Sequence, residues 1–497
     1  MKNVKIKKIL SLLIVAVMLI TSSAYVVVSA SDAPPPGAAT TDIYSSWAYW
    51  DVSMAQDVYG LGNEGTYSNF RGVLSEPKFQ AVIDSLNSKF GTDEKTEYKD
   101  PDAVTRGEVI DELYKIIGAA LKLDNMDTVS ACDYFVQNGL INGRADGDYQ
   151  LDQTCTVQEM IVFAKRVYEN LSYALGLDSK GFCWKVTGTG DNDVNTVYLF
   201  GTIHFGDSSL YPLSKAIEDA FASSKNLGVE ADISAVSQED QQYMMDKGFI
   251  KDGTTIEDLI SADTYKLYAD ACQKLGLPET TYDYLQPWMA YLLLSDMMTA
   301  SGSSSDTGSD AMAAAQKDAL LGIDMHFLNE AAADGNKNII SLESLKFQVD
   351  LLDSFSPELQ EYLLNSLVSP QTNSTDADAA ANSSDSSSAA VSAEDQASIV
   401  HQQFLQMLDM IKKGDDTTLV DYLGLNSLES DNPIITEYNN KFIIDRNKAM
   451  AEKIESFLSD ADSGGDYFIA VGAAHIIGDY GVVKILIDEG YTVERVG

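Results

Sequence analysis

Two histidines follow matched apolar segments, and no other feature of the sequence points so directly to chemistry. His204 closes the tetrapeptide Gly-Thr-Ile-His after the apolar segment 196–200, and His475 closes Gly-Ala-Ala-His after the segment 467–471. The chain has only four histidines. A lone histidine at a strand end is more often a core residue, but two in the same G-x-x-H context favour a shared site. Neutral imidazole is a common ligand of divalent metals.

A carboxylate also stands directly after an apolar segment, as the third polar residue in such a position. Glu230 comes directly after the apolar segment 226–229. A charge that follows a buried strand is costly unless it is paired, hydrogen-bonded or bound to a metal. Two imidazoles and one carboxylate would supply three metal ligands and leave positions open for water. We therefore predict a metal centre made by His204, Glu230 and His475, with Glu230 as the third ligand or as the general base. The alternative is an ordinary helix-capping or surface acid at Glu230.

The elements that would position these side chains are short apolar strands that alternate with amphipathic helices from residue 182 onward. This alternation predicts an α/β or α+β domain. A glycine stands three residues before each histidine, at Gly201 and Gly472. We expect these glycines to let the backbone turn sharply and approach a ligand closely.

Further short motifs follow one another along the same part of the chain. They are Gly201-Thr-Ile-His204, Leu210-Tyr-Pro-Leu213, Val229-Glu-Ala-Asp232, Gln286-Pro-Trp288, Gly322-Ile-Asp324, Ser341-Leu-Glu343 with Gln348, Arg446-Asn447 with Met450-Ala451, Val471-Gly-Ala-Ala-His475, and Gly490-Tyr-Thr-Val493. In this order they resemble the TraB/PrgY/GumN family, which includes the Tiki proteases, over about residues 182–497.

The resemblance implies a compact domain with a central mixed sheet flanked by helices, similar to the erythromycin-esterase/ChaN-like folds. Within the family, the Tiki members are described as metal-dependent proteases that use paired G-x-x-H motifs and an intervening glutamate. By position those residues are His204, His475 and Glu230. The metal would be Mn²⁺, Co²⁺ or Zn²⁺, because mixed nitrogen and oxygen ligation leaves the choice open.

Other polar residues of these motifs are further candidates for the site. Asp324 and Glu343 would be metal ligands or would orient an imidazole. Arg446 would neutralise an oxyanion or a substrate carboxylate, or it forms a structural salt bridge to an acid of the site. His326 could face the same site or be incidental, and His401 is expected to face solvent. No G-x-S-x-G motif is present, which argues against a serine hydrolase.

The start of the chain has the features of a secretory signal. Lysines up to Lys8 precede an apolar stretch at 9–20, and small residues come before position 30. A proline-rich spacer follows at 31–42. We expect residues 1–30 to be removed and the protein to be exported, with an uncleaved amino-terminal anchor as the alternative.

Residues 43–175 contain a weak internal repeat. Thr105 and Thr156 are each followed three residues later by glutamate and then by an apolar helical pattern, which predicts two capping boxes. These repeats resemble S-layer homology modules, a family that binds secondary polymers of the Gram-positive cell wall. Arg106 matches the polymer-reading arginine of that family, whereas Val157-Gln158 departs from the pattern. The alternative is an all-α spacer domain with degenerate repeats.

Cysteines and low-complexity segments complete the organisation of the chain. Four cysteines are an even number, and we favour a Cys132–Cys155 disulfide over four buried thiols because both residues fall in one short module. Two Ser/Asp/Ala-rich segments, at about 301–317 and 369–397, are too poor in bulky residues to order themselves. We expect them to be loop insertions in the second domain.

The charge of the chain excludes one large class of partners. It has 34 Lys and Arg against 75 Asp and Glu, a formal net charge of −41, and therefore no basic footprint for nucleic acid. The sequence as a whole favours an exported, cell-wall-associated metallohydrolase that acts on a peptide or protein, with wall polymer bound through residues 43–175. The alternative is a non-catalytic cell-surface protein that binds a peptide or polymer or takes part in signalling.

Overall fold

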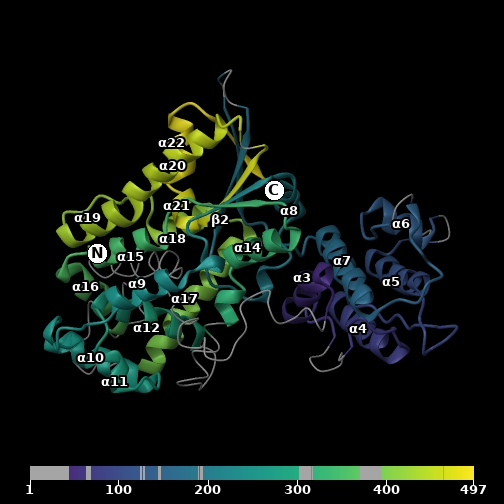
Figure 1. Ribbon diagram of the computed structural model, residues 1–497, viewed down its shortest axis with the longest axis horizontal. Coiled ribbons are helices and arrows are strands. Elements are labelled where there is room, and N and C mark those ends of the chain that lie inside the picture. The colour runs from purple at the N-terminus through teal and green to yellow at the C-terminus, as the bar shows by residue number, and fades with distance from the viewer. Residues whose placement is uncertain are drawn as a thin grey trace, which may run out of the picture.

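The computed structural model describes residues 44–497 except 63–68, 124–125, 127–128, 144–146, 189, 191–193, 302–314, 316, 370–392 and 463. Its amino-terminal helices form a small lobe beside a larger lobe that contains the sheet (Figure 1). The expected signal at 1–30 and the spacer at 31–42 lie outside the described residues. Within those residues, no helix has the length and apolar character that a membrane span requires.

The small lobe is built from helices, as the repeat pattern predicted. Its elements are η1 (Ser46–Ala48), α3 (Tyr49–Ser53), the π-helical turn η2 (Met54–Val58), α4 (Glu76–Phe90), α5 (Arg106–Leu121), α6 (Ala131–Gln137) and α7 (Val157–Leu175). Both predicted capping boxes are present. Thr105 caps α5 and Thr156 caps α7, and in each case the glutamate three residues later accepts a hydrogen bond from the threonine N–H at 2.9 Å.

A salt bridge joins the two repeats. The Arg106 guanidinium contacts the Glu159 carboxylate at 2.6 Å and donates to the Tyr149 carbonyl at 3.1 Å. Only 13% of the Arg106 side chain is exposed. This arginine therefore ties α5 to α7 within the lobe.

The predicted Cys132–Cys155 disulfide is not formed. All four cysteines are free thiols, and that of Cys155 is buried and donates to the Thr156 carbonyl. Proximity along the sequence suggested the pair, but packing places these thiols apart from any bonding partner. The alternative of unbridged cysteines is the correct one.

The large lobe contains one mixed sheet of six strands in the order β4-β3-β5-β2-β1-β6. Strands β2, β5, β3 and β4 are parallel, whereas β1 is antiparallel to both β2 and β6. All residues of β3 and β5 are buried, as expected for strands covered on both faces. The strands are β1 (Phe182–Thr187), β2 (Thr196–Thr202), β3 (Asn226–Val229), β4 (Asn338–Ser341), β5 (Tyr467–Gly472) and β6 (Thr492–Val496).

Helices cover the sheet, and the expectation of a mixed sheet flanked by helices is confirmed (Figure 1). They are α8 (Lys215–Ser223), α9 (Gln238–Gly248), α10 (Ala262–Lys274), α11 (Glu279–Tyr282), α12 (Pro287–Ser301), α14 (Ile323–Asp334), α15 (Leu345–Asp353), α16 (Pro357–Val368), α17 (Ala393–Lys413), α18 (Asp416–Leu423), α19 (Pro433–Tyr438), α20 (Asp445–Leu458), α21 (Ala473–Ile476) and α22 (Val482–Asp488), with short turns η5 (Ser208–Leu210), η6 (Ile233–Ala235), η7 (Ile256–Asp258) and η8 (Asn439–Ile444).

An aromatic cluster fastens α8 and α14 to the sheet. The Phe327 ring on α14 lies 4.7 Å from the Phe468 ring on β5 and 4.9 Å from the Phe221 ring on α8, measured between ring centroids. Phe200 on β2 completes the cluster, at 5.4 Å from Phe327. These contacts place the beginning of α14 beside the end of β2.

The central parts of the two expected insertions, 302–314 with 316 and 370–392, lie outside the described residues. Their described flanks are helical, since residues 317–320 are helical and α17 begins at Ala393, inside the segment expected to be a loop. We expected His401 on α17 to face solvent, but it does so only in part. It is partly buried, and its Nδ1 contacts the Thr299 carbonyl at 2.7 Å because α17 packs on α12.

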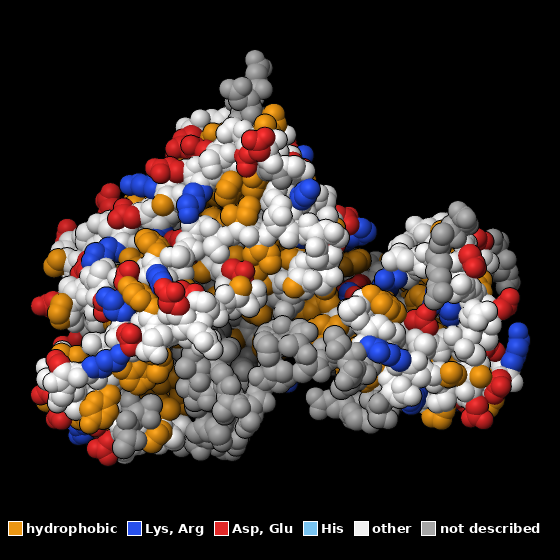
Figure 2. All heavy atoms as spheres, in the orientation of Figure 1, with side chains coloured by type: hydrophobic (Ala, Val, Ile, Leu, Met, Phe, Trp, Pro, Cys, Tyr) orange, Lys and Arg blue, Asp and Glu red, His pale blue; other side chains and the backbone are white. Residues whose placement is uncertain are grey.

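Acidic side chains are spread over both lobes on the face shown in Figure 2. On this face the net charge of −41 is thus a general property of the surface and not of one patch. Such a surface disfavours contact with polyanions through repulsion.

The capping boxes give a first testable prediction. Thr105→Ala and Thr156→Ala should each lower the free energy of unfolding by about 1 kcal/mol, because the helix loses the side-chain oxygen that satisfies a backbone N–H. Urea unfolding followed by circular dichroism measures this, with Thr154→Ala, at an exposed threonine just before α7, as the matched control. Equal stability of all three variants would contradict the assignment.

Candidate functional site

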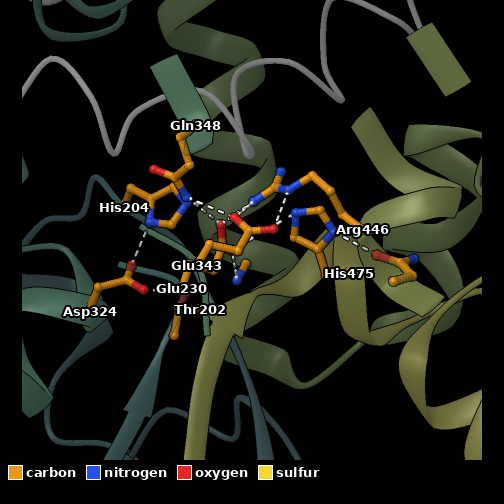
Figure 3. Close-up of polar contacts among 10 residues, drawn as sticks. Thr202, His204, Glu230, Asp324, Glu343, Gln348, Arg446 and His475 are labelled. Atoms are coloured by element: carbon orange, nitrogen blue, oxygen red, sulfur yellow. Dashed lines mark hydrogen bonds and ion pairs between the residues drawn. The ribbon is translucent and has the colours of Figure 1, made fainter. Parts of the chain in front are cut away.

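The four parallel strands end at one edge of the sheet, and polar residues follow each of them. His204 follows β2, Glu230 follows β3, Glu343 follows β4, and His475 follows β5 within α21. All but Glu343 are among the buried polar residues, and the Glu343 side chain is only 8% exposed. The structure therefore brings together the three residues predicted from the strand ends, and it adds Glu343 to them (Figure 3).

Asp324 holds the His204 imidazole. The Nδ1–H of His204 donates to Asp324 Oδ2 at 2.7 Å, and the Thr202 hydroxyl donates to Asp324 Oδ1 at 2.8 Å. Burial alone would lower the pKa of His204, but the Asp324 carboxylate and its hydrogen bond, helped by Glu230, outweigh burial and raise it. Asp324 thus has the geometry of an orienting group, with both its oxygens engaged behind the ring.

Asn447 holds the second imidazole in a similar manner. The Nδ1–H of His475 donates to Asn447 Oδ1 at 2.6 Å, and Asn447 Nδ2 donates to the Tyr480 carbonyl at 2.7 Å. Burial, the Arg446 guanidinium and the nearby His204 lower the pKa of His475 well below its usual value. His475 is therefore neutral, and with its proton on Nδ1 it carries a lone pair on Nε2.

The other nitrogen of each ring has no hydrogen-bond partner. The Nε2 atoms of His204 and His475 are both buried, and neither finds a partner among the described residues. Buried polar atoms are almost always satisfied, so two unsatisfied imidazole nitrogens at one strand edge require an explanation. Figure 3 shows the two rings on either side of the Glu230 and Glu343 carboxylates.

Gly472 leaves the space into which these groups converge. A Cβ atom at this position would lie 3.1 Å from Glu230 Oε1, 3.6 Å from His204 Nε2 and 3.6 Å from His475 Cδ2. Its φ angle is −49°, so the glycine is not needed for a left-handed turn. Gly201 is likewise a packing position, since its Cβ would lie 3.1 Å from the Ala473 Cα. The chain turns at Gly472 from β5 into α21 without a positive φ, and at both glycines the missing Cβ gives room for a close approach, to the polar groups at Gly472 and to Ala473 at Gly201.

A buried ion network holds Glu230. Arg446 on α20 contacts Glu230 Oε2 at 2.7 Å and Glu343 at 2.8 Å through both Nε and Nη2. Glu230 Oε1 accepts the Gly472 N–H at 2.7 Å and lies 3.9 Å from His475 Nε2. Burial opposes the charge of Arg446, but the two carboxylates raise its pKa further above its usual range. Arg446 thus forms the salt bridge that the sequence left as one of two alternatives.

The donor chemistry of this edge fits a divalent metal only in part. Two imidazoles that are each held at Nδ1 and lack a partner at Nε2 are the arrangement that metal-binding histidines show. However, His204, His475 and Glu230 do not bring three ligand atoms within 4.8 Å of one another. Among the described residues one other group does so, and it consists of Glu218, His326 and Glu330. His326 therefore does not face the predicted site.

Sequence reasoning missed Asn447 as a functional residue. It stands directly after Arg446 in one of the short motifs, but nothing in its local context shows that it faces His475. Thr202 was missed in the same way, although it precedes His204 by two residues and shares its partner Asp324. Both depend on contacts between distant segments.

A family model describes these residues together. The model of the TraB/PrgY/gumN family matches residues 182–495, well over half of the chain. The chain belongs to the TraB/PrgY/gumN family. The match contains β1 to β5, all but the last residue of β6, and the whole polar cluster, whereas α3 to α7 lie before it. No curated protein and no solved structure matches the chain.

The ion network of this TraB/PrgY/gumN domain is the basis of a second prediction. Arg446→Met should lower the free energy of unfolding by about 3–5 kcal/mol, because Glu230 and Glu343 would be left buried without their counter-charge. Urea unfolding measures the loss. Lys413→Met is the control, because Lys413 pairs with Asp409 at the surface and its loss should cost about 0–1 kcal/mol. Similar losses of unfolding free energy for the two variants would contradict the role of Arg446 as the counter-charge of both carboxylates.

Proposed function

We propose that the chain is an exported metal-dependent hydrolase that cleaves peptide bonds. The observation that carries this proposal is the pair of buried imidazoles whose Nε2 atoms lack partners while their Nδ1 atoms are held by Asp324 and Asn447. Structural histidines are normally satisfied at both nitrogens when buried. A cation between the rings would satisfy both.

His204 and His475 would hold the metal, and Glu230 would be the third ligand or the base beside it. The nitrogen and oxygen donors suit Mn²⁺, Co²⁺ or Zn²⁺. When bound, such an ion supplies Lewis acidity, which polarises the scissile carbonyl and makes a nearby water easier to deprotonate. Membership of the TraB/PrgY/gumN family supports the fold. The proposed reaction is based on the types and positions of the side chains at the strand ends.

The protein groups have separable roles in this proposal. Asp324 and Asn447 orient the imidazoles and keep Nε2 of each ring available. As the base, Glu230 would take a proton from the attacking water through Oε1 and return it to the leaving amine. Arg446 holds Glu230 in place and stabilises negative charge that develops on the carbonyl oxygen.

A surface cavity beside the network is the proposed place for the substrate. It has a volume of about 420 Å³ and lies between the ends of β3 and β4. Glu343 belongs both to this cavity and to the ion network, so the cavity leads toward the buried groups. Its other lining residues include Asp232, Ser341 and Lys453. Charged groups of both signs suit the polar backbone of a peptide.

Export and attachment to the cell wall complete the proposal. They are supported by the signal-like residues 1–30 and by the matched capping boxes of α5 and α7 in the S-layer-like repeats. Because Arg106 is engaged with Glu159, contact with wall polymer would depend on other groups of this lobe.

Metal content tests the central claim. The double variant His204→Gln/His475→Gln should contain one equivalent of metal less than the unsubstituted protein, because both unsatisfied nitrogens are removed. Mass spectrometry after dialysis against Mn²⁺, Co²⁺ or Zn²⁺ measures the content, and circular dichroism checks the fold. His401→Gln, at a histidine bonded to the Thr299 carbonyl, is the matched control. Unchanged metal content in the double variant would count against the site.

Glu230→Gln separates the two roles of Glu230. If Glu230 is the base, the variant keeps the metal and loses cleavage of a peptide library by about 10²-fold or more. If Glu230 is a ligand, the variant loses both. Peptide binding that persists without metal and without cleavage in all variants would favour the non-catalytic alternative.

A further inference from the structure

A second cluster of ligand-type side chains lies between the two lobes. Glu218 on α8 and His326 and Glu330 on α14 each offer one ligand atom, and these atoms all lie within 4.8 Å of one another. The cluster faces α3, because the His326 ring lies 5.6 Å from the Trp50 ring. Asp324, two residues earlier on α14, faces His204 instead. The cluster is therefore separate from the site at the strand ends.

Three polar atoms of this cluster are buried without hydrogen bonds, although the Glu218 and Glu330 side chains are 24% and 33% exposed. His326 is 6% exposed, and neither of its ring nitrogens has a hydrogen-bond partner among the described residues. Oε2 of Glu330 is likewise buried and without a hydrogen-bond partner among the described residues. An imidazole with both nitrogens unsatisfied is a costly arrangement in a buried place, and it points to a missing partner.

The spacing of the three groups is that of ligands around a metal. His326 Nε2 lies 3.6 Å from Glu218 Oε1 and 3.4 Å from Glu330 Oε2. Both distances are long for hydrogen bonds. Two ligands at bond lengths of about 2.0–2.1 Å and a tetrahedral angle are separated by about 3.3–3.4 Å. A small ion fits at this spacing with little movement of the side chains.

The surroundings contain more negative than positive charge. Two lysines are nearby. Lys317 lines the cavity beside His326, whereas Lys165 on α7 lies 3.0 Å from both Asp51 and Glu169 of the small lobe. Its charge is thus engaged on that side of the junction. Burial, followed by nearby carboxylates, raises the pKa of Glu218 to about 8 and that of Glu330 to about 7.

We propose that Glu218, His326 and Glu330 form a divalent-metal site at the junction of the two lobes. One nitrogen and two carboxylate oxygens are ligands that Zn²⁺ accepts, with water in a fourth position. All three ligands come from the family domain, and α3 of the small lobe covers them. A cavity of about 340 Å³, lined by Trp50, Tyr211 and His326, gives the ion a path from the surface.

The ion would strengthen the junction between the lobes. It neutralises Glu218 and Glu330, both of which are repelled by Glu169 of the small lobe. It also fixes the His326 ring, which packs against Trp50 and, at 4.9 Å, against Tyr211. The site is therefore structural in character, and its occupancy is independent of hydrolysis.

The test uses the full chain with the strand-edge histidines already replaced, as His204→Gln/His475→Gln. Dialysis against Zn²⁺ followed by mass spectrometry should find one equivalent of zinc. Adding His326→Gln or Glu330→Gln should weaken zinc binding at least tenfold, whereas adding His401→Gln should not. Two separate ligand variants, each checked by circular dichroism, keep the test valid if one of them does not fold. Absence of zinc from the background protein, or zinc binding unchanged by both ligand variants, overturns the proposal.

Fluorescence locates the ion independently. Co²⁺ in this site should quench the emission of Trp50, whose ring lies next to His326. The quenching should disappear in Trp50→Phe and in His326→Gln, and persist when His204 and His475 are replaced. Quenching that requires His204 and His475 would assign the ion to the strand edge and refute the junction site. The two metal proposals can therefore fail separately.

Discussion

The salt bridge network of Arg446 with Glu230 and Glu343 is the interaction on which the strand edge depends. Two buried carboxylates that follow adjacent strands would repel each other at high cost in the absence of a counter-charge. The guanidinium from α20 compensates them, and the Gly472 N–H adds a hydrogen bond from β5. One network thus joins the ends of three parallel strands to a helix. The position of Glu230 relative to both histidines follows from it.

The strand ends explain why so few sequence features sufficed to find the cluster. Parallel strands bring their carboxyl ends to one edge, and residues that follow them meet there regardless of their separation in the chain. His204, Glu230 and His475 could therefore be grouped from local patterns alone. The α/β character of the domain and the two capping boxes were predictable because strand periodicity and helix caps are encoded locally, whereas the mixed sheet was expected only from the family resemblance.

The features that sequence reasoning missed all depend on packing between distant segments. Asn447 reaches His475 because α20 lies beside α21, and His401 is partly buried because α17 packs on α12. The direction of His326 was open for a related reason. Residues two apart on a helix point to nearly opposite sides, so Asp324 and His326 cannot both face the same site, and the docking of α14 decides which one does. The free state of Cys155 is also a result of packing.

Helix α14 connects the two polar clusters physically. It begins against the backbone that carries His204, since the Ile323 N–H donates to the Ile203 carbonyl at 2.9 Å. Gly322 allows this close approach, because a Cβ there would collide with the His204 carbonyl. The same helix presents His326 to the small lobe, so whatever holds His326 also restrains the element that positions Asp324 behind His204. The small lobe therefore influences the strand edge by packing on α14, and α14 in turn positions Asp324 behind the His204 imidazole.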